Sequence, residues 1–200
     1  MKIRRICVFC GSSYGIGSIY KEAATQLGHI LVSNNIGLVY GGGDVGLMGT
    51  IADTVFKNGG EVIGIIPRHL AEKEVAHRGI SDLRIVNSMH ERKALMEKLS
   101  DAFIAMPGGF GTIEEIFEAI TWAQLELHVK PCGFLNINGF FDKLFDFINM
   151  VSTEGFIQNG YLDLIQKDNS PLKLLQKLTC YQPVNIDKAR HAIEERESNV

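Results

Sequence analysis

Nine consecutive residues form the part of the sequence best suited to chemistry. Residues 107–115 read Pro-Gly-Gly-Phe-Gly-Thr-Ile-Glu-Glu, follow an apolar run at 102–106 and precede a helical pattern. A strand, a glycine loop and a helix N-terminus in that order form an anion site, because glycine lets backbone N–H groups approach a phosphate and the helix terminus carries partial positive charge. The motif therefore predicts a phosphate-binding loop.

Glu115, the last residue of this motif, has two interpretations. Thr112 and Glu115 have the spacing of a capping box, in which Thr112 is the N-cap residue and Glu115 bonds back to it. Alternatively, the apolar stripe of the helix turns Glu115 away from the core and toward the glycine loop. There the helix dipole would keep the carboxylate ionised, as a base or a cation stabiliser requires. The sequence leaves both interpretations open.

Arg92 is a second candidate for chemistry. Residues 88–93 read Ser-Met-His-Glu-Arg-Lys, and Ser88 and Glu91 have the spacing of another capping box. Arg92 stands at the top of a stripe that is otherwise apolar, so its guanidinium is predicted to point inward. An inward guanidinium needs a carboxylate or another anion as its partner. We therefore interpret Arg92 as a site residue rather than as half of a structural ion pair.

A second glycine loop invites a dinucleotide interpretation that the following strand does not support. Gly41, Gly43 and Gly46 match G-x-G-x-x-G. The ribose-binding acid expected about twenty residues later is replaced by Ile-Ile-Pro-Arg at 65–68. Close packing, or contact with a phosphate or ribose, is the favoured use of these glycines.

The cysteines and histidines do not suggest a metal site. Cys7 and Cys10 form a C-x-x-C, but residues three apart on a strand face opposite sides, and no second pair completes a zinc site. Both are predicted to be core residues. Four histidines are scattered without ligand spacing and are predicted to lie on the surface or in loops: His69, His77, His90 and His128.

Apolar runs and helical periods alternate along the chain, which predicts an α/β fold with a doubly wound parallel sheet. Strands are expected at 3–10, 37–40, 61–66, 83–86, 102–106 and 131–136. Helices are expected at 16–34, 46–58, 88–99, 112–127 and 140–154, with short ones at 158–165 and 171–178. The loops after the first, second and fifth strands should then converge at one sheet edge.

Composition limits the classes of protein to consider. The 200 residues are 46% hydrophobic, which suffices for one domain at 1–184 followed by a polar tail at 185–200. A net charge of −3 provides no basic field for a nucleic acid polymer, so a nucleotide partner would be a small molecule. No run approaches the ~20 apolar residues of a membrane span, and a cytoplasmic location is expected.

The two motifs at 89–93 and 107–115 resemble the paired M-H-x-R-K and P-G-G-x-G-T-x-x-E signatures of the Lonely Guy family. These proteins are cytokinin riboside 5′-monophosphate phosphoribohydrolases, formerly labelled possible lysine decarboxylases. The similarity extends to 10–13, 41–49, 121–125 and 133–157. Glu126 stands where a glycine is expected, and we expect this departure to affect only a helix end.

The resemblance implies a Rossmann-like fold, a homodimer and hydrolysis of the N-glycosidic bond of a purine nucleoside 5′-monophosphate, without metal or cofactor. By position, Arg92 and Glu115 match the catalytic pair. The substrate contacts implied by the resemblance and by the converging loops are Glu74, Lys93, Gly108, Gly109, Phe110, Gly111, Thr112, Ile113, Glu114, Thr121, Ser12, Gly42 and Gly43. A carboxylate such as Glu115 could stabilise an oxocarbenium-like ribosyl centre or position water.

Two other classes of function stay open at this point. A non-catalytic nucleotide-binding or carrier protein on the same fold would use the glycine loops without needing Glu115. A decarboxylase would need pyridoxal phosphate on a lysine such as Lys93, and no motif supports a Schiff base there. The sequence does not indicate whether adenine or an N6-substituted adenine is preferred.

Overall fold

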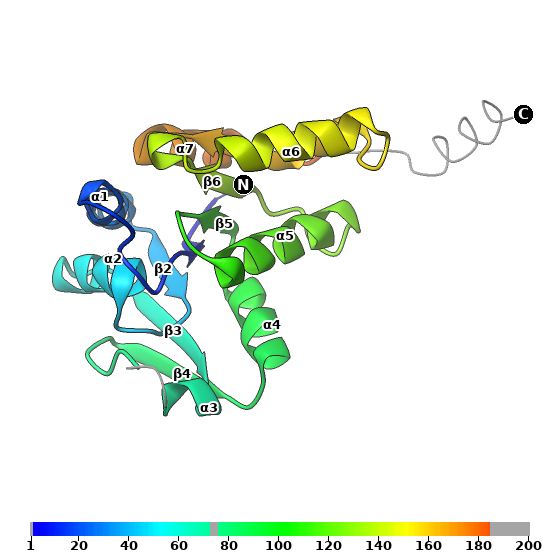
Figure 1. Ribbon diagram of the computed structural model, residues 1–200. Coiled ribbons are helices and arrows are strands. Elements are labelled where there is room, and N and C mark those ends of the chain that lie inside the picture. The colour runs from blue at the N-terminus through cyan, green and yellow to red at the C-terminus, as the bar shows by residue number, and fades with distance from the viewer. Residues whose placement is uncertain (1, 73–75, 185–200) are drawn as a thin grey trace, which may run out of the picture.

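Buried strands alternate with amphipathic helices in the computed structural model, which describes residues 2–72 and 76–184 (Figure 1). The strands are β1 (Arg5–Phe9), β2 (Gly37–Tyr40), β3 (Val62–Pro67), β4 (Asp82–Val86), β5 (Ala102–Ala105), β6 (Cys132–Leu135) and β7 (Ile165–Asp168). The α-helices are α1 (Ile19–Ser33), α2 (Gly46–Lys57), α3 (Arg68–Ala71), α4 (Met89–Leu99), α5 (Phe110–Gln124), α6 (Asp142–Thr153) and α7 (Pro171–Cys180). Two 3-10 helices, η1 (Ile137–Gly139) and η2 (Asn159–Leu164), complete the described elements.

The seven strands form one parallel sheet in the order β4-β3-β2-β1-β5-β6-β7. The chain winds outward from β1 to β4, returns to the other side of β1 at β5, and continues outward to β7. The predicted doubly wound sheet is thereby confirmed. The winding direction changes between β1 and β5, so the chain continues to opposite faces of the sheet after these two strands, and in such folds ligands bind in the crevice at this point.

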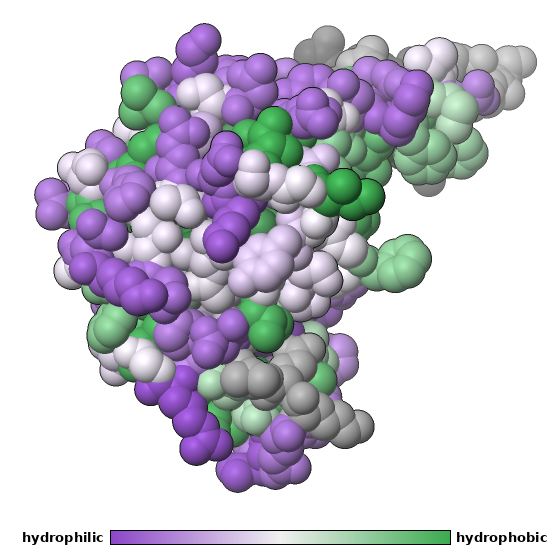
Figure 2. Space-filling view, turned by 60° about the vertical axis from the view of Figure 1, so that its left-hand side comes forward, coloured by the Kyte–Doolittle hydropathy of each residue, from purple (hydrophilic) through white to green (hydrophobic). Residues whose placement is uncertain are grey.

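Helices cover both faces of the sheet, so the inner strands are apolar on both sides. One buried cluster joins the sheet to α1, α2 and α7, and a second joins it to α4, α5 and α6. Cys10 lies in the first cluster and Cys7 in the second, which confirms that both are core residues on opposite sides of β1. Figure 2 shows hydrophilic side chains over much of the surface near α1 and α2, as expected when the apolar stripes of these helices turn inward.

All six predicted strands are present. Helix α3 is not among the predicted helices, α1 begins at Ile19 rather than at residue 16, and further differences lie at the ends of the sheet and of α5. The short helix predicted at 158–165 is partly wrong: a 3-10 helix fills 159–164, and the edge strand β7 follows it. Helix α5 begins at Phe110, two residues before the predicted start. Glu74 and the predicted tail at 185–200 lie outside the described residues. Within the described segments, no helix is long and apolar enough to cross a membrane.

Candidate active site

The loops after β1 and β5 meet in one pocket at the change of winding direction. The N–H of Gly11 donates to the Pro107 carbonyl at 3.1 Å, which joins the two loops. Ser12, predicted as a ligand contact, lines this pocket together with Gly108 and Gly109. The remaining lining residues are Ser13, Tyr14, Gly15, Tyr20, Leu47 and Phe140. The predicted convergence of these two loops is confirmed.

The N-terminus of α5 is open on the side of the glycine loop. Gly109 is the N-cap residue, and no side chain caps the helix. A Cβ added at Gly109 or Gly111 would meet nothing within 4 Å, and Phe110 is 97% exposed. The first backbone N–H groups of α5 therefore face accessible space with the positive end of the helix dipole behind them. This is the anion-binding arrangement that the motif predicts.

The capping box predicted for Thr112 and Glu115 is wrong. Because α5 begins at Phe110, Thr112 is the third helical residue, and its buried hydroxyl packs against the Cα of Gly108. Glu115 is consequently free of a capping role. The capping box at Ser88 is partly confirmed, because Ser88 Oγ accepts from the Glu91 N–H at 3.1 Å while Glu91 Oε2 accepts from Asn87 at 2.8 Å.

Arg92 and Glu115 form a buried ion pair between α4 and α5. Arg92 Nη2 lies 3.2 Å from Glu115 Oε1, and the two side chains are 12% and 10% exposed. The guanidinium rests on the Cα of Gly41, where any Cβ would collide with Nη2. Among the described residues, no acceptor bonds to Arg92 Nε. The prediction that Arg92 points inward to a carboxylate is confirmed, and the guanidinium retains a donor for a further partner.

Burial governs the ionisation of Glu115. Removal from water raises the pKa of its carboxyl, Arg92 acts in the opposite direction, and Glu114 adds to the rise. The prediction that this side chain faces away from the core is wrong, since its carboxylate lies in the protein interior. The helix dipole alone is therefore a poor guide to its charge, and the ionised form is favoured by Arg92 and, to a smaller extent, by Lys93.

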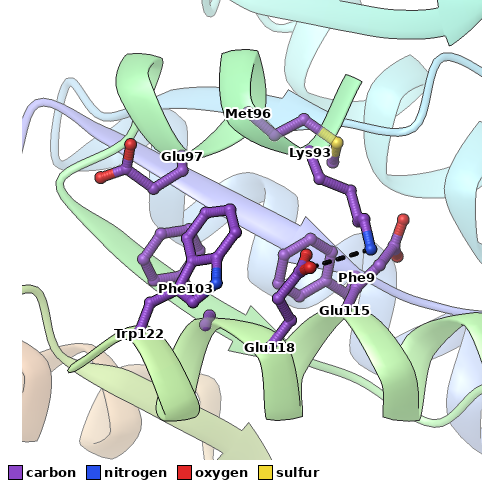
Figure 3. Close-up of a pocket in the computed structure, with 9 residues that line it drawn as sticks. Phe9, Lys93, Met96, Glu97, Phe103, Glu115, Glu118 and Trp122 are labelled. Carbon is purple, nitrogen blue, oxygen red and sulfur yellow. Dashed lines mark hydrogen bonds and ion pairs between the residues drawn. The ribbon is translucent and has the colours of Figure 1, made fainter. Parts of the chain in front are cut away.

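Lys93 lies next to this pair but is held by two other carboxylates. Its Nζ donates to Glu114 Oε1 at 2.6 Å and to Glu118 Oε1 at 3.0 Å. Burial lowers the pKa of Lys93, but these two hydrogen bonds outweigh burial and raise it. Figure 3 shows the lysine over a small pocket between α4 and α5, with the contact to Glu118 dashed. The pocket is lined by Phe9, Lys93, Met96, Glu97, Phe103, Glu115, Glu118, Ala119 and Trp122.

The glycines of the second loop do not line the pocket, although Gly46 packs against Ser12 and the next residue, Leu47, does line it. The Gly42 carbonyl accepts from the His77 N–H at 3.0 Å, and Gly43 forms a β-bridge with Ala76. At the start of α2, the Leu47 N–H donates to the Gly11 carbonyl at 3.0 Å. The first N–H groups of α2 are thus hydrogen-bonded within the protein, unlike those of α5. This disfavours binding of a dinucleotide phosphate at the start of α2.

The other predicted contacts are spread around the site. Ile113 packs against the core cluster of α4, α5 and α6, and Glu114 is half exposed. Thr121 is exposed, and its hydroxyl donates to the Phe117 carbonyl at 2.7 Å, on a part of α5 remote from the glycine loop. Trp122 is half buried over the pocket between α4 and α5.

His77 and His128 lie in loops, as predicted, but they are buried, with exposed fractions of 6% and 9%. His128 packs on the Phe103 ring, with the ring centroids 5.4 Å apart. His77 lies 3.2 Å from Asp53 Oδ1. Each is surrounded by residues distant in sequence, so no local pattern could have placed it. Within residues 2–72 and 76–184, no cluster of histidine, cysteine and acidic residues has the makings of a metal site.

Comparison with known proteins finds one family and several relatives. The family described as possible lysine decarboxylase matches residues 48–178. Cytokinin riboside 5′-monophosphate phosphoribohydrolase LOG3 of Arabidopsis thaliana is 50% identical over 182 residues, which are 91% of this chain and 85% of that protein. Cytokinin riboside 5′-monophosphate phosphoribohydrolase LOG of Oryza sativa subsp. japonica is 48% identical over 182 residues, which are 91% of this chain and 75% of that protein.

Solved structures share the fold at lower identity. The molybdenum cofactor binding protein of Rippkaea orientalis has a TM-score of 0.63 and 22% identity, covering 90% of this chain and 97% of that one. The molybdenum cofactor carrier protein of Chlamydomonas reinhardtii has a TM-score of 0.64 and 17% identity, covering 90% and 100%. At these identities the likeness concerns the fold alone.

Proposed function

Because the chain belongs to the possible lysine decarboxylase family, together with the phosphoribohydrolases that it matches, we propose that it hydrolyses the N-glycosidic bond of purine nucleoside 5′-monophosphates. The products are the free base and ribose 5-phosphate. The observation that carries the assignment to particular residues is the buried Arg92–Glu115 pair next to the open N-terminus of α5.

The spacing along α5 suits a ribose 5-phosphate. Glu115 is five residues beyond Phe110, which is about 8 Å along the helix axis. A phosphate held by the first N–H groups of α5 would therefore place the ribose near the Glu115 carboxylate. Binding energy from the phosphate then contributes at the reacting carbon, because it fixes the sugar against the catalytic pair.

The reaction replaces the bond from C1′ of the ribose to the base by a bond from C1′ to a water oxygen. As the bond from C1′ to the base nitrogen breaks, its electron pair leaves with the base and positive charge develops on the sugar. An ionised Glu115 stabilises that charge or takes the proton of the attacking water, whose oxygen bonds to C1′. Arg92 favours the ionised form of Glu115 in a buried setting.

The residues predicted to contact the substrate are proposed to serve different parts of the site. Ser12 and the residues from Gly108 to Ile113 would approach the phosphate from the two joined loops. Lys93 and Glu114 form a charged border beside Glu115, while Gly42 and Gly43 support the loop under Arg92. Glu74 and Thr121 are proposed to contact the substrate, as the resemblance to the family implies.

The two other classes of function have weaker support. A decarboxylase would need a neutral lysine to form a Schiff base, whereas Lys93 is bonded to two carboxylates that raise its pKa. A carrier would not need a buried Arg92–Glu115 pair beside its anion site. The relatives that cover most of this chain are phosphoribohydrolases, and the cofactor-binding neighbours share only the fold.

A substrate panel tests the function. The wild-type protein is incubated with AMP, N6-isopentenyl-AMP and the matching nucleosides, and the products are separated by chromatography. We expect free base and ribose 5-phosphate from the nucleotides, and at least ~10²-fold lower catalytic efficiency with the nucleosides, since a neutral 5′-hydroxyl forfeits several charge-assisted hydrogen bonds. Equal cleavage of AMP and adenosine would exclude the phosphate site. Release of orthophosphate in place of base would exclude the reaction class.

We also propose that the enzyme is a homodimer in the cytoplasm. A cluster of exposed apolar side chains in the turn after α5 supports the dimer: Leu125, Leu127 and Val129 are 55%, 68% and 57% exposed. Such clusters commonly mark protein interfaces. The cytoplasmic location is supported by four free cysteines and no disulfide among the described residues.

A further inference from the structure

We propose that His77 is a positioning residue: it fastens the second glycine loop to α2 and so holds the Arg92 guanidinium against Glu115. The inference rests on the proposed function, because the consequence of this fastening is measured as turnover. Its grounds are a chain of contacts that begins at Asp53 and ends at the catalytic pair.

The His77 backbone and side chain contact different elements. The backbone N–H donates to the Gly42 carbonyl at 3.0 Å, beside the β-bridge of Ala76 and Gly43. The imidazole Nε2 lies 3.2 Å from Asp53 Oδ1 on α2 and 3.5 Å from Asp44 Oδ1 in the glycine loop. One buried side chain thus ties the segment before β4 both to the glycine loop and to α2.

The hydrogen bonds around the ring define its tautomer. The Gly79 N–H donates to Nδ1 at 3.3 Å, so Nδ1 is an acceptor and the ring proton lies on Nε2. Nε2–H then donates to Asp53, whose other oxygen accepts from Lys57 Nζ at 2.8 Å. Asp53 is therefore held by hydrogen bonds from both sides, and His77 uses one ring nitrogen as a donor and the other as an acceptor.

The position of the glycine loop in turn determines where the Arg92 guanidinium lies. Gly41 directly precedes the residue that His77 binds, and the Arg92 guanidinium rests on the Gly41 Cα with no room for a Cβ. Gly42 has a φ of 79°, which glycine adopts readily and other residues rarely do, and Ile66 leaves little room for a Cβ there. A loop that moved away from α2 would remove the surface that supports Arg92. Small displacements of such groups are costly in rate.

Substitutions at His77 separate the proposed contact from general packing. His77→Leu fills the space without hydrogen bonds, and we expect ~10-fold lower kcat with AMP. His77→Gln can direct its amide N–H toward Asp53, and we expect kcat within ~3-fold of wild type. Asp53→Ala removes the acceptor from the other side and should lower kcat as His77→Leu does. The Asp53→Ala variant therefore also tests the proposal if His77→Leu fails to fold.

A double-mutant cycle shows whether the effect passes through Arg92. In an Arg92→Lys background, His77→Leu should change the residual kcat by less than 2-fold, because the group it positions is already gone. A second ~10-fold loss in that background would overturn the proposal, since it would mean that His77 acts on the fold in general. Equal kcat for His77→Leu and wild type would overturn it as well.

A readout that does not need turnover separates this inference from the proposed function. The Nε–H resonance of Arg92 in a ¹⁵N correlation spectrum is identified by its loss in Arg92→Lys. We expect it to shift in His77→Leu and to return toward its wild-type position in His77→Gln. An unchanged resonance in His77→Leu would refute the positioning role. A wild-type protein that releases no base from any nucleotide would instead refute the proposed function, while the resonance would still decide the role of His77.

Discussion

At the scale of single residues, the buried pair of Arg92 and Glu115 has consequences that an exposed ion pair would not have. Each side chain is about nine-tenths buried, so removing one leaves the other as an uncompensated charge in a medium of low dielectric. In the proposed function, Glu115 faces the sugar on which positive charge develops, and Arg92 keeps Glu115 ionised. Loss of either group should therefore affect rate more than binding.

We expect Arg92→Ala and Glu115→Gln each to lower kcat with AMP by ~10²-fold or more, while circular dichroism shows a folded protein. Glu115→Gln is the sharper test because it keeps the shape and removes only the charge. Glu91→Gln on α4 is the matched control, since its amide oxygen can still accept from the Asn87 N–H. Near-normal turnover in folded Glu115→Gln would refute the catalytic assignment.

The raised pKa of Glu115 predicts the pH dependence. Burial raises this pKa above the ordinary value of 4.5, so the fraction of ionised carboxylate, and with it kcat/KM, should fall at a higher pH than for an exposed glutamate. Removing the opposing charge in Arg92→Gln should move the acid limb of the residual activity to still higher pH. A rate profile that stays flat down to pH 4.5 in the wild type would contradict the role of an ionised Glu115.

At the scale of elements, the end of α5 explains the departure from the family pattern at Glu126. This residue has a φ of 61°, in the left-handed region that favours glycine. Its N–H donates to Ala123 at 3.0 Å, and the Leu127 N–H donates to Trp122 at 2.9 Å, which is the Schellman arrangement of a helix C-terminus. A glycine is expected here because the motif requires this backbone conformation.

Glu126→Gly should accordingly stabilise the protein by about 1 kcal/mol, because it relieves the left-handed strain without removing a hydrogen bond. Equilibrium unfolding in urea measures this as a higher midpoint at an unchanged slope. Glu126→Ala is the control, since it removes the same charge but keeps a Cβ. A midpoint for Glu126→Gly at or below that of Glu126→Ala would contradict the strain argument.

The predictable elements are those whose signals are local. The inner strands β1, β2, β3 and β5 are apolar on both faces, and glycine loops follow β1, β2 and β5, so the sequence pattern is enough to place all four. The start of α5 was missed because the N-cap residue Gly109 carries no side-chain signal, whereas Thr112, three residues later, does. β7 was missed because its Ile-Gln-Lys-Asp sequence is short and polar, as an edge strand can be.

At the scale of the whole molecule, the long-range contacts mark the limit of sequence reasoning. The motifs placed Arg92 and Glu115 on separate helices, but their 3.2 Å approach depends on how α4 and α5 pack over β1 and β5. The buried His77 depends in the same way on a segment, a loop and a helix meeting. Composition predicts one domain, and the alternation of strands and helices predicts the α/β fold. The long-range contacts, in contrast, can be described only from the folded structure.

The exposed apolar turn after α5 predicts how the molecule associates. Leu127, between two other exposed aliphatic residues, is 68% exposed, which is costly unless another surface covers it. Trp122 on α5 is partly covered by its own chain, so it gives less reason for a dimer than the turn does. Two identical patches meeting about a twofold axis would bury both at once.

We expect light scattering at micromolar concentration to give twice the mass of the chain, and Leu127→Asp to lower it toward the monomer value. A charge in the centre of an apolar contact is costly to desolvate, and in a symmetric dimer each substitution acts twice. Leu172→Asp is the control, because Leu172 is also about half exposed but lies on α7, on the opposite face of the sheet. A monomeric wild-type protein would refute the dimer. A dimer that persists in Leu127→Asp and is lost in Leu172→Asp would move the interface to the face of α1 and α7.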